Sequence, residues 1–430
     1  MRDTKLWHPF SDMATVRHNE FVLTRGEGIW LWDEDGKKYI DGSGSLWLAQ
    51  IGHGRPEIAD AVAEQMKELE AYSIFTEIAT PPARDLAQRL SDLAPMDDTK
   101  VFLTSGGGDA IETAMKIARM YWEIQGETQR HHLIGRLNGY HGSWGFGTSV
   151  GGIGPNKAGF GPLMNETAHV EHDSVDDLER IIGELGAQNV AAFVFEPVMG
   201  AGGVLLPPEG YIESVTELCQ SLGVLVVVDA VICGFGRLGT WFGVERFGIE
   251  PDMITFAKGV TSGYLPVGGV AVSGRVAEPF WSEPGRAFLR HGPTYAGHAA
   301  CCVAGLVNID ILEREGIVGR GQELEGVLHE ALRPLEGHPL VKEVRGGLGL
   351  LGAVQLHDAV VEAVPGASLL LGAYAREAGI VLRPFLSGVP LAPPLIITPD
   401  EIKLSAAMVG EALDTFERTH ADALSSAVAS

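Results

Sequence analysis

The sequence predicts an α/β fold, with a mostly parallel sheet between helices in a large domain and a smaller α/β domain beside it. Short apolar runs alternate with helical patterns through the middle of the chain, which is the rhythm of βαβ units. The pattern changes toward the C-terminal end, which indicates a second unit. The chain has 430 residues, of which 45% are hydrophobic, so it can bury a large core in more than one domain.

The central part of the chain predicts a series of buried strands. They are KVFLT (100–104), HHLIGRL (131–137), AAFVFEP (191–197), GVLVVVD (223–229) and DMITFAK (252–258). Residues 108–122 and 213–223 have helical patterns and lie between such runs. Strands that alternate with helices in this way form a sheet that is covered on both faces.

Both ends of the chain contribute to the predicted smaller domain. Residues 26–41 predict a hairpin that packs on the C-terminal part. That part predicts two strand pieces or a bend, then a helix, then a strand, over residues 344–356, 368–380 and 381–385. A last helix begins with Thr398, Pro399 and Glu401, a capping box with proline at the first helical position. Residues 424–430 are expected to be frayed.

These elements divide the chain into three segments. We expect the N-terminal part of the smaller domain at residues 1–60, the large domain at 61–315 and the C-terminal part of the smaller domain at 316–430. In open parallel sheets, ligands bind beyond the carboxyl ends of the strands. Asp229 lies at such an end, so the large domain is expected to hold the functional site.

Charge and composition argue against several kinds of partner. Acidic residues exceed basic ones, 56 against 32, and the net charge of −24 disfavours nucleic acid or an anionic membrane. No apolar run reaches the roughly 18 residues of a membrane helix, and the first residues lack a signal core. The cysteines at 219, 233, 301 and 302 form no C-x-x-C pair. They suit reduced thiols in a cytoplasmic protein, with no disulfide frame and no metal site.

Asp229 is a carboxylate at the end of an apolar run, and two interpretations of it are open. Asp often caps a turn where a strand ends. Alternatively, the carboxylate serves a buried ligand, because an uncompensated buried charge costs several kcal/mol or becomes protonated. In the second case, a positively charged group should face Asp229.

Lys258 and a glycine-rich turn are the next candidates. Lys258 ends an apolar strand, where desolvation lowers the pKa of an amine and makes it a better nucleophile; a solvated surface lysine is the alternative. In SGGGDAIE (105–112), three glycines lead into a helix whose Asp109 and Glu112 make a capping pattern. Backbone N–H groups at such a helix start bind phosphate, although a flexible turn explains the glycines equally well.

Two further side chains complete a pattern. Tyr140 in NGYHGSWG is placed to stack on a flat ring or to be ordinary core, and Thr294 in HGPTYAGH offers a hydroxyl to a phosphate. A Schiff-base lysine, a carboxylate for a pyridinium nitrogen, a glycine and helix cradle for phosphate and a stacking aromatic together describe pyridoxal phosphate.

At this point the sequence resembles the class III aminotransferases, the fold-type I enzymes that use pyridoxal 5′-phosphate. The most specific part is DAVICGFGRLG followed by PDMITFAKGVTSGYLPVGG, and EPVMGAGG (196–203) supports it. The resemblance covers nearly the whole chain and implies that residues 61–315 hold the cofactor as a Schiff base on Lys258. It implies Lys258 and Asp229 as catalytic residues. The implied cofactor contacts are Gly107, Gly108, Tyr140, His141, Glu196, Asp229, Ile232, Lys258 and Thr294.

Within the class, the chain is most similar to the ω-transaminases, the amine:pyruvate or β-alanine:pyruvate group. Relatives that act on γ-aminobutyrate or ornithine commonly carry Gln where this chain has Ile232 and Glu where it has Ala201. The missing polar groups imply a pocket that tolerates apolar amines. In the ω-transaminases an arginine near the C-terminus binds the substrate carboxylate and swings aside for apolar groups, and GIVLRPF provides Arg383 there.

The resemblance also implies further substrate contacts and an assembly. The implied substrate contacts are Trp47, Phe75, Tyr140, Ala201 and Arg383. In the family, the residues corresponding to Phe75 and Thr294 act across a subunit boundary, which implies a homodimer with shared active sites, or a tetramer of such dimers. The implied reaction is ping-pong transfer of an amino group from an amine or ω-amino acid to pyruvate or another keto acid.

Three features of the sequence depart from the family pattern. Ala230 stands where Glu is usual after the ring-binding Asp, and Ala299 replaces a common proline. Gly106, Gly107 and Gly108 stand where the cradle usually reads Ser-Gly-Ser, so Gly108 offers an N–H but no hydroxyl. We therefore expect weaker cofactor retention than in close relatives. Two alternatives stay open: another class III enzyme, of the diaminopelargonate type or an aminomutase, and a non-catalytic homologue.

Overall fold

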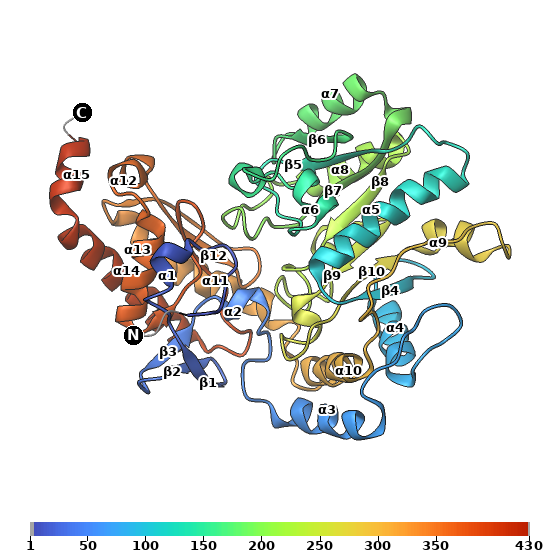
Figure 1. Ribbon diagram of the computed structural model, residues 1–430. Coiled ribbons are helices and arrows are strands. Elements are labelled where there is room, and N and C mark those ends of the chain that lie inside the picture. Colours follow the sequence, from blue (N-terminus) through green and yellow to red (C-terminus); the bar gives the residue numbers. More distant parts are fainter. Residues whose placement is uncertain (1–3, 429–430) are drawn as a thin grey trace.

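The structure is a computed structural model that describes residues 4–428. Its central feature is a seven-stranded sheet in the large domain (Figure 1). In spatial order the strands are β4 (Lys100–Thr104), β10 (Gly268–Val272), β9 (Met253–Phe256), β8 (Leu225–Asp229), β7 (Val190–Phe195), β5 (His132–Arg136) and β6 (Thr167–Val170). β10 runs antiparallel to both of its neighbours, and the other strands share one direction. The predicted α/β fold with a mostly parallel sheet is confirmed.

Both faces of this sheet are covered, which explains why its strands read as continuous apolar runs. Val226 and Val228 of β8 pack into the core on one face, and Leu225 and Val227 pack into the core on the other. The helix α5 (Gly107–Ile124) lies on the second face. The first face is covered by α7 (Val175–Leu185), α8 (Tyr211–Ser221) and α10 (Ala299–Arg314).

The smaller domain joins the two ends of the chain. One sheet has the order β1 (Leu23–Glu27), β2 (Trp30–Asp33), β3 (Lys38–Asp41) and β13 (Ile380–Val381), and the other has β11 (Val341–Arg345), β12 (Gly352–Leu356) and β14 (Gly388–Leu391). β13 pairs in parallel with β3, so residues more than three hundred positions apart share one sheet. In Figure 1 the blue N-terminal and red C-terminal segments accordingly lie together beside the large domain.

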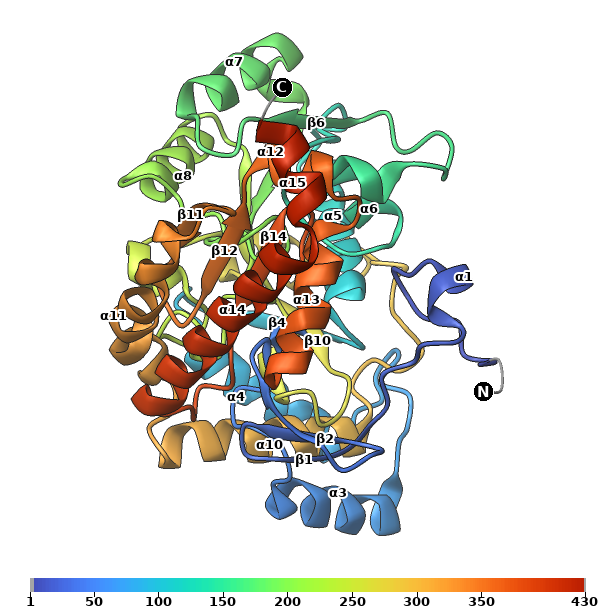
Figure 2. The ribbon, with the colours of Figure 1, turned by 90° about the vertical axis from the view of Figure 1, so that its left-hand side faces the viewer.

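Helices cover this part of the molecule as well. They are α11 (Arg320–Leu332), α12 (Asp358–Ala363), α13 (Ala367–Ala378), α14 (Pro399–Thr419) and α15 (Ala421–Val428). Figure 2 shows α13 and α14 side by side, and these two helices pack against each other. The remaining helices are α1 (Met13–Val16), α2 (Gly44–Trp47), α3 (Pro56–Leu69), α4 (Pro81–Leu93), α6 (Gly145–Val150) and α9 (Gly274–Trp281). Within residues 4–428, no helix is both long enough and apolar enough to cross a bilayer.

Most of the local predictions for the two ends are confirmed. The hairpin at residues 26–41 is formed by β2 and β3, and the two strand pieces at 344–356 are β11 and β12. The capping box of α14 is present, with Thr398 accepting from the Glu401 N–H and the Glu401 carboxylate accepting from the Thr398 N–H. We propose that the domain boundary near residue 60 be moved to the start of α3, because α3 packs on α10 of the large domain.

One local prediction is wrong, and another stays a prediction. The strand expected over 381–385 ends at Val381, because the Arg383 N–H donates to the Ser43 hydroxyl and Pro384 has no N–H to donate. The fraying expected for residues 424–430 stays a prediction: residues 424–428 are helical in α15, which packs on α12 and α14. The last two residues of that stretch, 429–430, lie outside the described residues.

Candidate active site

A cavity of about 520 Å³ opens at the carboxyl ends of the parallel strands. It lies where β7, β8 and β9 end and where α5 begins. Its lining is Leu46, Ser105, Gly106, Gly107, Gly108, Asp109, Tyr140, His141, Gly142, Ser143, Trp144, Glu196, Asp229, Val231, Ile232 and Lys258. The position agrees with the general location of ligand sites in open α/β sheets.

Asp229 combines both of the interpretations that the sequence left open. Its side chain is only 4% exposed and lines the cavity. One carboxylate oxygen accepts from the Val231 N–H at 3.1 Å, which is the turn-capping contact. The other oxygen lies 2.8 Å from Nδ1 of His141, so the ring donates its Nδ1 proton to the carboxylate. His141 thus orients Asp229, and the same carboxylate lines the cavity, where it can face a cation.

Lys258 follows β9 and presents its amine to the same cavity. Burial lowers its pKa from the ordinary value of 10.5 to about 8, against the opposing charges of Asp229 and Glu196. The nearby positive charge of Arg383 lowers the pKa of Lys258 further. An amine with this pKa is substantially unprotonated just above neutral pH, so it can act as a nucleophile and as a base.

Glu196 is a buried carboxylate that holds the turn carrying Tyr140. Its two oxygens accept from the backbone N–H groups of Tyr140 and Gly200, each at 3.0 Å. Burial raises the pKa of Glu196, and the nearby Asp229 carboxylate raises it further. These hydrogen bonds fasten the Tyr140 turn to the end of β7, and Tyr140 itself lines the cavity.

The start of α5 forms the opposite end of the cavity. The helix has Gly106 at its N-cap position and no side-chain cap, so its first N–H groups are free for a ligand. The predicted capping role of Asp109 and Glu112 is wrong. The Glu112 carboxylate instead accepts from the N–H groups of Phe146 and Gly147, at 2.6 and 3.2 Å, and so fastens the neighbouring turn to α5.

Eight of the nine expected cofactor contacts line this cavity, and the exception is Thr294. Thr294 is exposed on the loop before α10. Phe75, from the connection between α3 and α4, approaches this loop, since a Cβ on Gly292 would be 3.3 Å from the Phe75 ring. Phe75 is 47% exposed. Within one chain, therefore, both Phe75 and Thr294 lie outside the lining of the cavity, and Phe75 is close to Gly292, two residues before Thr294.

The remaining expected substrate contacts surround the cavity. Trp47, Ala201 and Ile232 belong to one apolar cluster, and the Trp47 ring centroid is 5.5 Å from the Lys258 Nζ. Arg383 is exposed, and its guanidinium carbon lies 5.9 Å from the ring centroid of Phe10.

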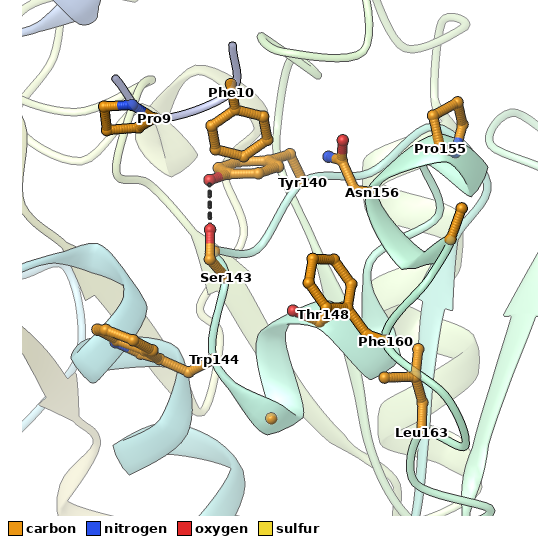
Figure 3. Close-up of a pocket in the computed structure, with 13 residues that line it drawn as sticks. Pro9, Phe10, Tyr140, Ser143, Trp144, Thr148, Pro155, Asn156, Phe160 and Leu163 are labelled. Carbon is orange, nitrogen blue, oxygen red and sulfur yellow. Dashed lines mark hydrogen bonds between the residues drawn. The ribbon is translucent and has the colours of Figure 1, made fainter. Parts of the chain in front are cut away.

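A second cavity of about 560 Å³ shares Tyr140, Ser143 and Trp144 with the first (Figure 3). Phe10 meets the Tyr140 ring edge-on there, with 6.5 Å between ring centroids, and the Tyr140 hydroxyl is 3.4 Å from that of Ser143. Phe160 and Leu163 add to its apolar lining. Phe10, Phe160 and Leu163 were not predicted from the sequence, because each lies in an irregular segment and shows no periodic pattern. No cluster of side chains within residues 4–428 has the composition of a metal site.

Comparison with known proteins adds an independent line of information. The family model described as Aminotransferase class-III matches residues 13–413. A putrescine–pyruvate aminotransferase of Pseudomonas aeruginosa is 35% identical over 429 residues, covering 94% of this chain and 93% of the relative. A thermostable (S)-enantioselective ω-transaminase of Thermomicrobium roseum superposes with a TM-score of 0.91 and 38% identity, over 95% of this chain and 96% of that one. A PLP-bound amine transaminase of an uncultivated Pseudomonas species also has a TM-score of 0.91, with 36% identity over 96% and 99% of the two chains.

Proposed function

Since this chain belongs to the class III aminotransferases, we propose that it transfers an amino group from an amine or ω-amino acid to pyruvate, using pyridoxal phosphate. The observation that carries the proposal is the meeting of Asp229, Lys258 and the glycine-led start of α5 in one cavity. The activities for which its relatives are named, putrescine–pyruvate aminotransferase among them, support the choice of pyruvate as acceptor.

The residues present fit the cofactor. Asp229 is a buried carboxylate for a cationic ring nitrogen, and Lys258 is an amine of lowered pKa for an aldehyde. The first N–H groups of α5 suit a phosphate. Gly107 at this point packs closely on Val231, since a Cβ at position 107 would lie 3.1 Å from the Val231 side chain. When bound, the cofactor supplies an electron-accepting ring that stabilises negative charge beside the amine nitrogen.

The chain's own groups then perform the proton chemistry. The Lys258 amine takes a proton from the carbon that carries the donor's amino group and later returns one, as a base and then an acid. The Asp229 carboxylate favours the protonated ring nitrogen, because opposite charges attract strongly where water is excluded. His141 keeps that carboxylate in position through its 2.8 Å hydrogen bond. Donor and acceptor use the same site in turn, which gives ping-pong kinetics.

Arg383 is the proposed contact for the carboxylate of pyruvate. It lies beside Phe10 at the side of the site, and no carboxylate among residues 4–428 forms an ion pair with it. A guanidinium holds a carboxylate through two parallel hydrogen bonds, and its long stem permits it to move aside for an apolar group. The apolar cluster of Trp47, Ala201 and Ile232 supports a pocket for the organic part of an amine.

We further propose a homodimer with shared sites, in the cytoplasm. Phe75 and Thr294 are both exposed and lie outside the cavity of their own chain, which supports a role for them at the site of a second subunit. All four cysteines are unpaired and buried, which supports a reducing compartment.

The test is to follow the two half-reactions separately. Addition of an amine donor without acceptor should remove the visible absorbance of the bound cofactor, and addition of pyruvate should restore it and form alanine. A donor panel of alanine, β-alanine, γ-aminobutyrate and 1-phenylethylamine separates this activity from that of other class III enzymes. Restoration by 2-oxoglutarate but not by pyruvate would contradict the proposed acceptor, and a lack of response to every donor would favour a non-catalytic homologue.

A further inference from the structure

At the start of α5, the indole of Trp144 occupies the space that a side chain at position 108 would need. A Cβ on Gly108 would lie 2.7 Å from Trp144 Nε1 and 2.8 Å from Cδ1, closer than real side chains approach. Gly108 is the position where the resembled family usually carries the second serine of its cradle. The position of the Trp144 indole therefore requires glycine at position 108.

The backbone around Trp144 is fixed to α5 on both sides. After it, the N–H groups of Phe146 and Gly147 donate to Glu112 of α5. Before it, Gly142 has a φ of +98°, and a Cβ there would be only 3.0 Å from the Gly108 Cα. Figure 3 shows Trp144 turned away from the Phe10 and Phe160 rings. The indole is held toward the first turn of α5 by its own backbone.

The indole N–H is available to a ligand at this end of the cavity. Trp144 lines the same cavity as Gly107 and Gly108, and its side chain is 55% exposed. Within residues 4–428, no acceptor receives a hydrogen bond from its Nε1, which can act only as a donor. The one cationic side chain in the described lining of the cavity is Lys258, so an anionic group near α5 depends on neutral N–H donors.

We propose that the Trp144 indole N–H binds the phosphate of the cofactor and replaces the hydroxyl that Gly108 lacks. The proposal rests on pyridoxal phosphate as the cofactor of the proposed function. A hydrogen bond from an N–H to a charged phosphate oxygen is stronger than one between neutral groups. Trp144 therefore offsets the weaker cofactor retention that Gly108 alone leads us to expect.

The first experiment compares two ligands that differ only in the phosphate. Apoprotein is titrated with pyridoxal phosphate and with pyridoxal, and the two Kd values are measured from visible absorbance. Trp144→Phe keeps an aromatic ring but removes the N–H. It should raise the Kd for pyridoxal phosphate about tenfold and leave the Kd for pyridoxal unchanged. Trp281→Phe, at another exposed tryptophan (67%), is the matched control and should change neither value.

A second set of variants tests the spatial coupling independently. Gly108→Ser alone should weaken pyridoxal phosphate binding, because its Cβ meets Trp144. Gly108→Ser combined with Trp144→Ala should bind more tightly than either single variant, a non-additive result. Unchanged binding of pyridoxal phosphate in Trp144→Phe, or an equal loss for both ligands, would overturn the inference. Failure of the unmodified protein to bind pyridoxal phosphate would instead overturn the proposed function on which it rests.

Discussion

Asp229 is the residue on which the chemistry of the site depends most. Its side chain is nearly inaccessible to solvent. One oxygen accepts from a backbone N–H and the other lies against His141, so the orientation of the carboxylate is fixed. Asp229→Asn keeps the shape and removes the charge. The first half-reaction should slow by about a hundredfold or more, because a fixed charge in a dry site is a major source of transition-state stabilisation.

The measurement for Asp229→Asn is the single-turnover rate with 1-phenylethylamine. Thermal unfolding of the same variant provides the control, since the fold should be retained. A rate within tenfold of the unmodified protein would show that the carboxylate is not the partner of the ring nitrogen.

Lys258 gives the site its expected pH dependence. Its pKa is lowered to about 8, chiefly by burial, so the unprotonated amine becomes the major form above that pH. The rate at which apoprotein captures pyridoxal phosphate should therefore rise with pH through about 8 and then level off. This capture rate is measured by stopped-flow absorbance between about pH 6 and about pH 10, at roughly constant ionic strength. A rate that still rises toward the ordinary lysine pKa of 10.5 would indicate a solvated amine.

At the residue scale, the reactive side chains could be predicted from the sequence, but the contacts between the turns around them could not. Asp229 and Lys258 stand at strand ends, where a polar residue after an apolar run is visible. The contact of Trp144 with Gly108 depends on how two irregular turns approach each other, and no local pattern encodes it. The contact of Phe10 with Tyr140 could not be predicted for the same reason.

Among the elements, the turn at α2 has a strained backbone. Ser45 and Trp47 have φ values of 59° and 56°, which non-glycine residues adopt at a cost of about 1–3 kcal/mol each. Asp41, which is 1% exposed, accepts from the Ser45 N–H with both oxygens, at 2.8 and 2.7 Å, and from His53 at 2.8 Å. This carboxylate holds the turn that brings Trp47 over Lys258.

Asp41→Asn should therefore lower the free energy of unfolding by about 1–3 kcal/mol, because it replaces one acceptor oxygen in a buried network with a donor. Denaturant unfolding measures the change. The exposed Asp35→Asn is the matched control and should be nearly neutral. Equal effects of the two substitutions would mean that Asp41 does not support the turn.

The elements themselves were predicted best where their signals were local. The capping box of α14 is contained in four residues, whereas β10 was missed because its run begins with two glycines. The structure explains the second of these, Gly269: a Cβ there would lie 2.5 Å from the Phe256 ring and 2.6 Å from the Phe102 carbonyl. A glycine that suggests a break in the sequence is here required by close packing inside a sheet.

For the whole molecule, the alternation of strands and helices was sufficient to predict the fold class. The pairing of β13 with β3 could not be predicted, because two residues of strand carry no information about a partner so distant in the chain. The proposed dimer belongs to this scale as well, since Thr294 completes the site only if a second chain supplies it.

Co-expression of two impaired variants tests the shared site. Lys258→Ala and Thr294→Ala should regain activity together, because a mixed dimer has one site with Lys258 from one chain and Thr294 from the other. The control co-expresses Thr294→Ala with a variant that carries both Lys258→Ala and Thr294→Ala. Its activity should not exceed that of Thr294→Ala alone. Activity that never exceeds the sum of the separate preparations would refute a site shared between subunits.

The most direct measurement of the central claim is to locate the covalent attachment of the cofactor. The holoprotein is reduced with borohydride, digested and mapped by mass spectrometry. The account predicts one pyridoxyl phosphate group, on Lys258, and no visible cofactor band in Lys258→Ala. Attachment at another lysine, or a scatter over surface lysines with Lys258 unmodified, would contradict it.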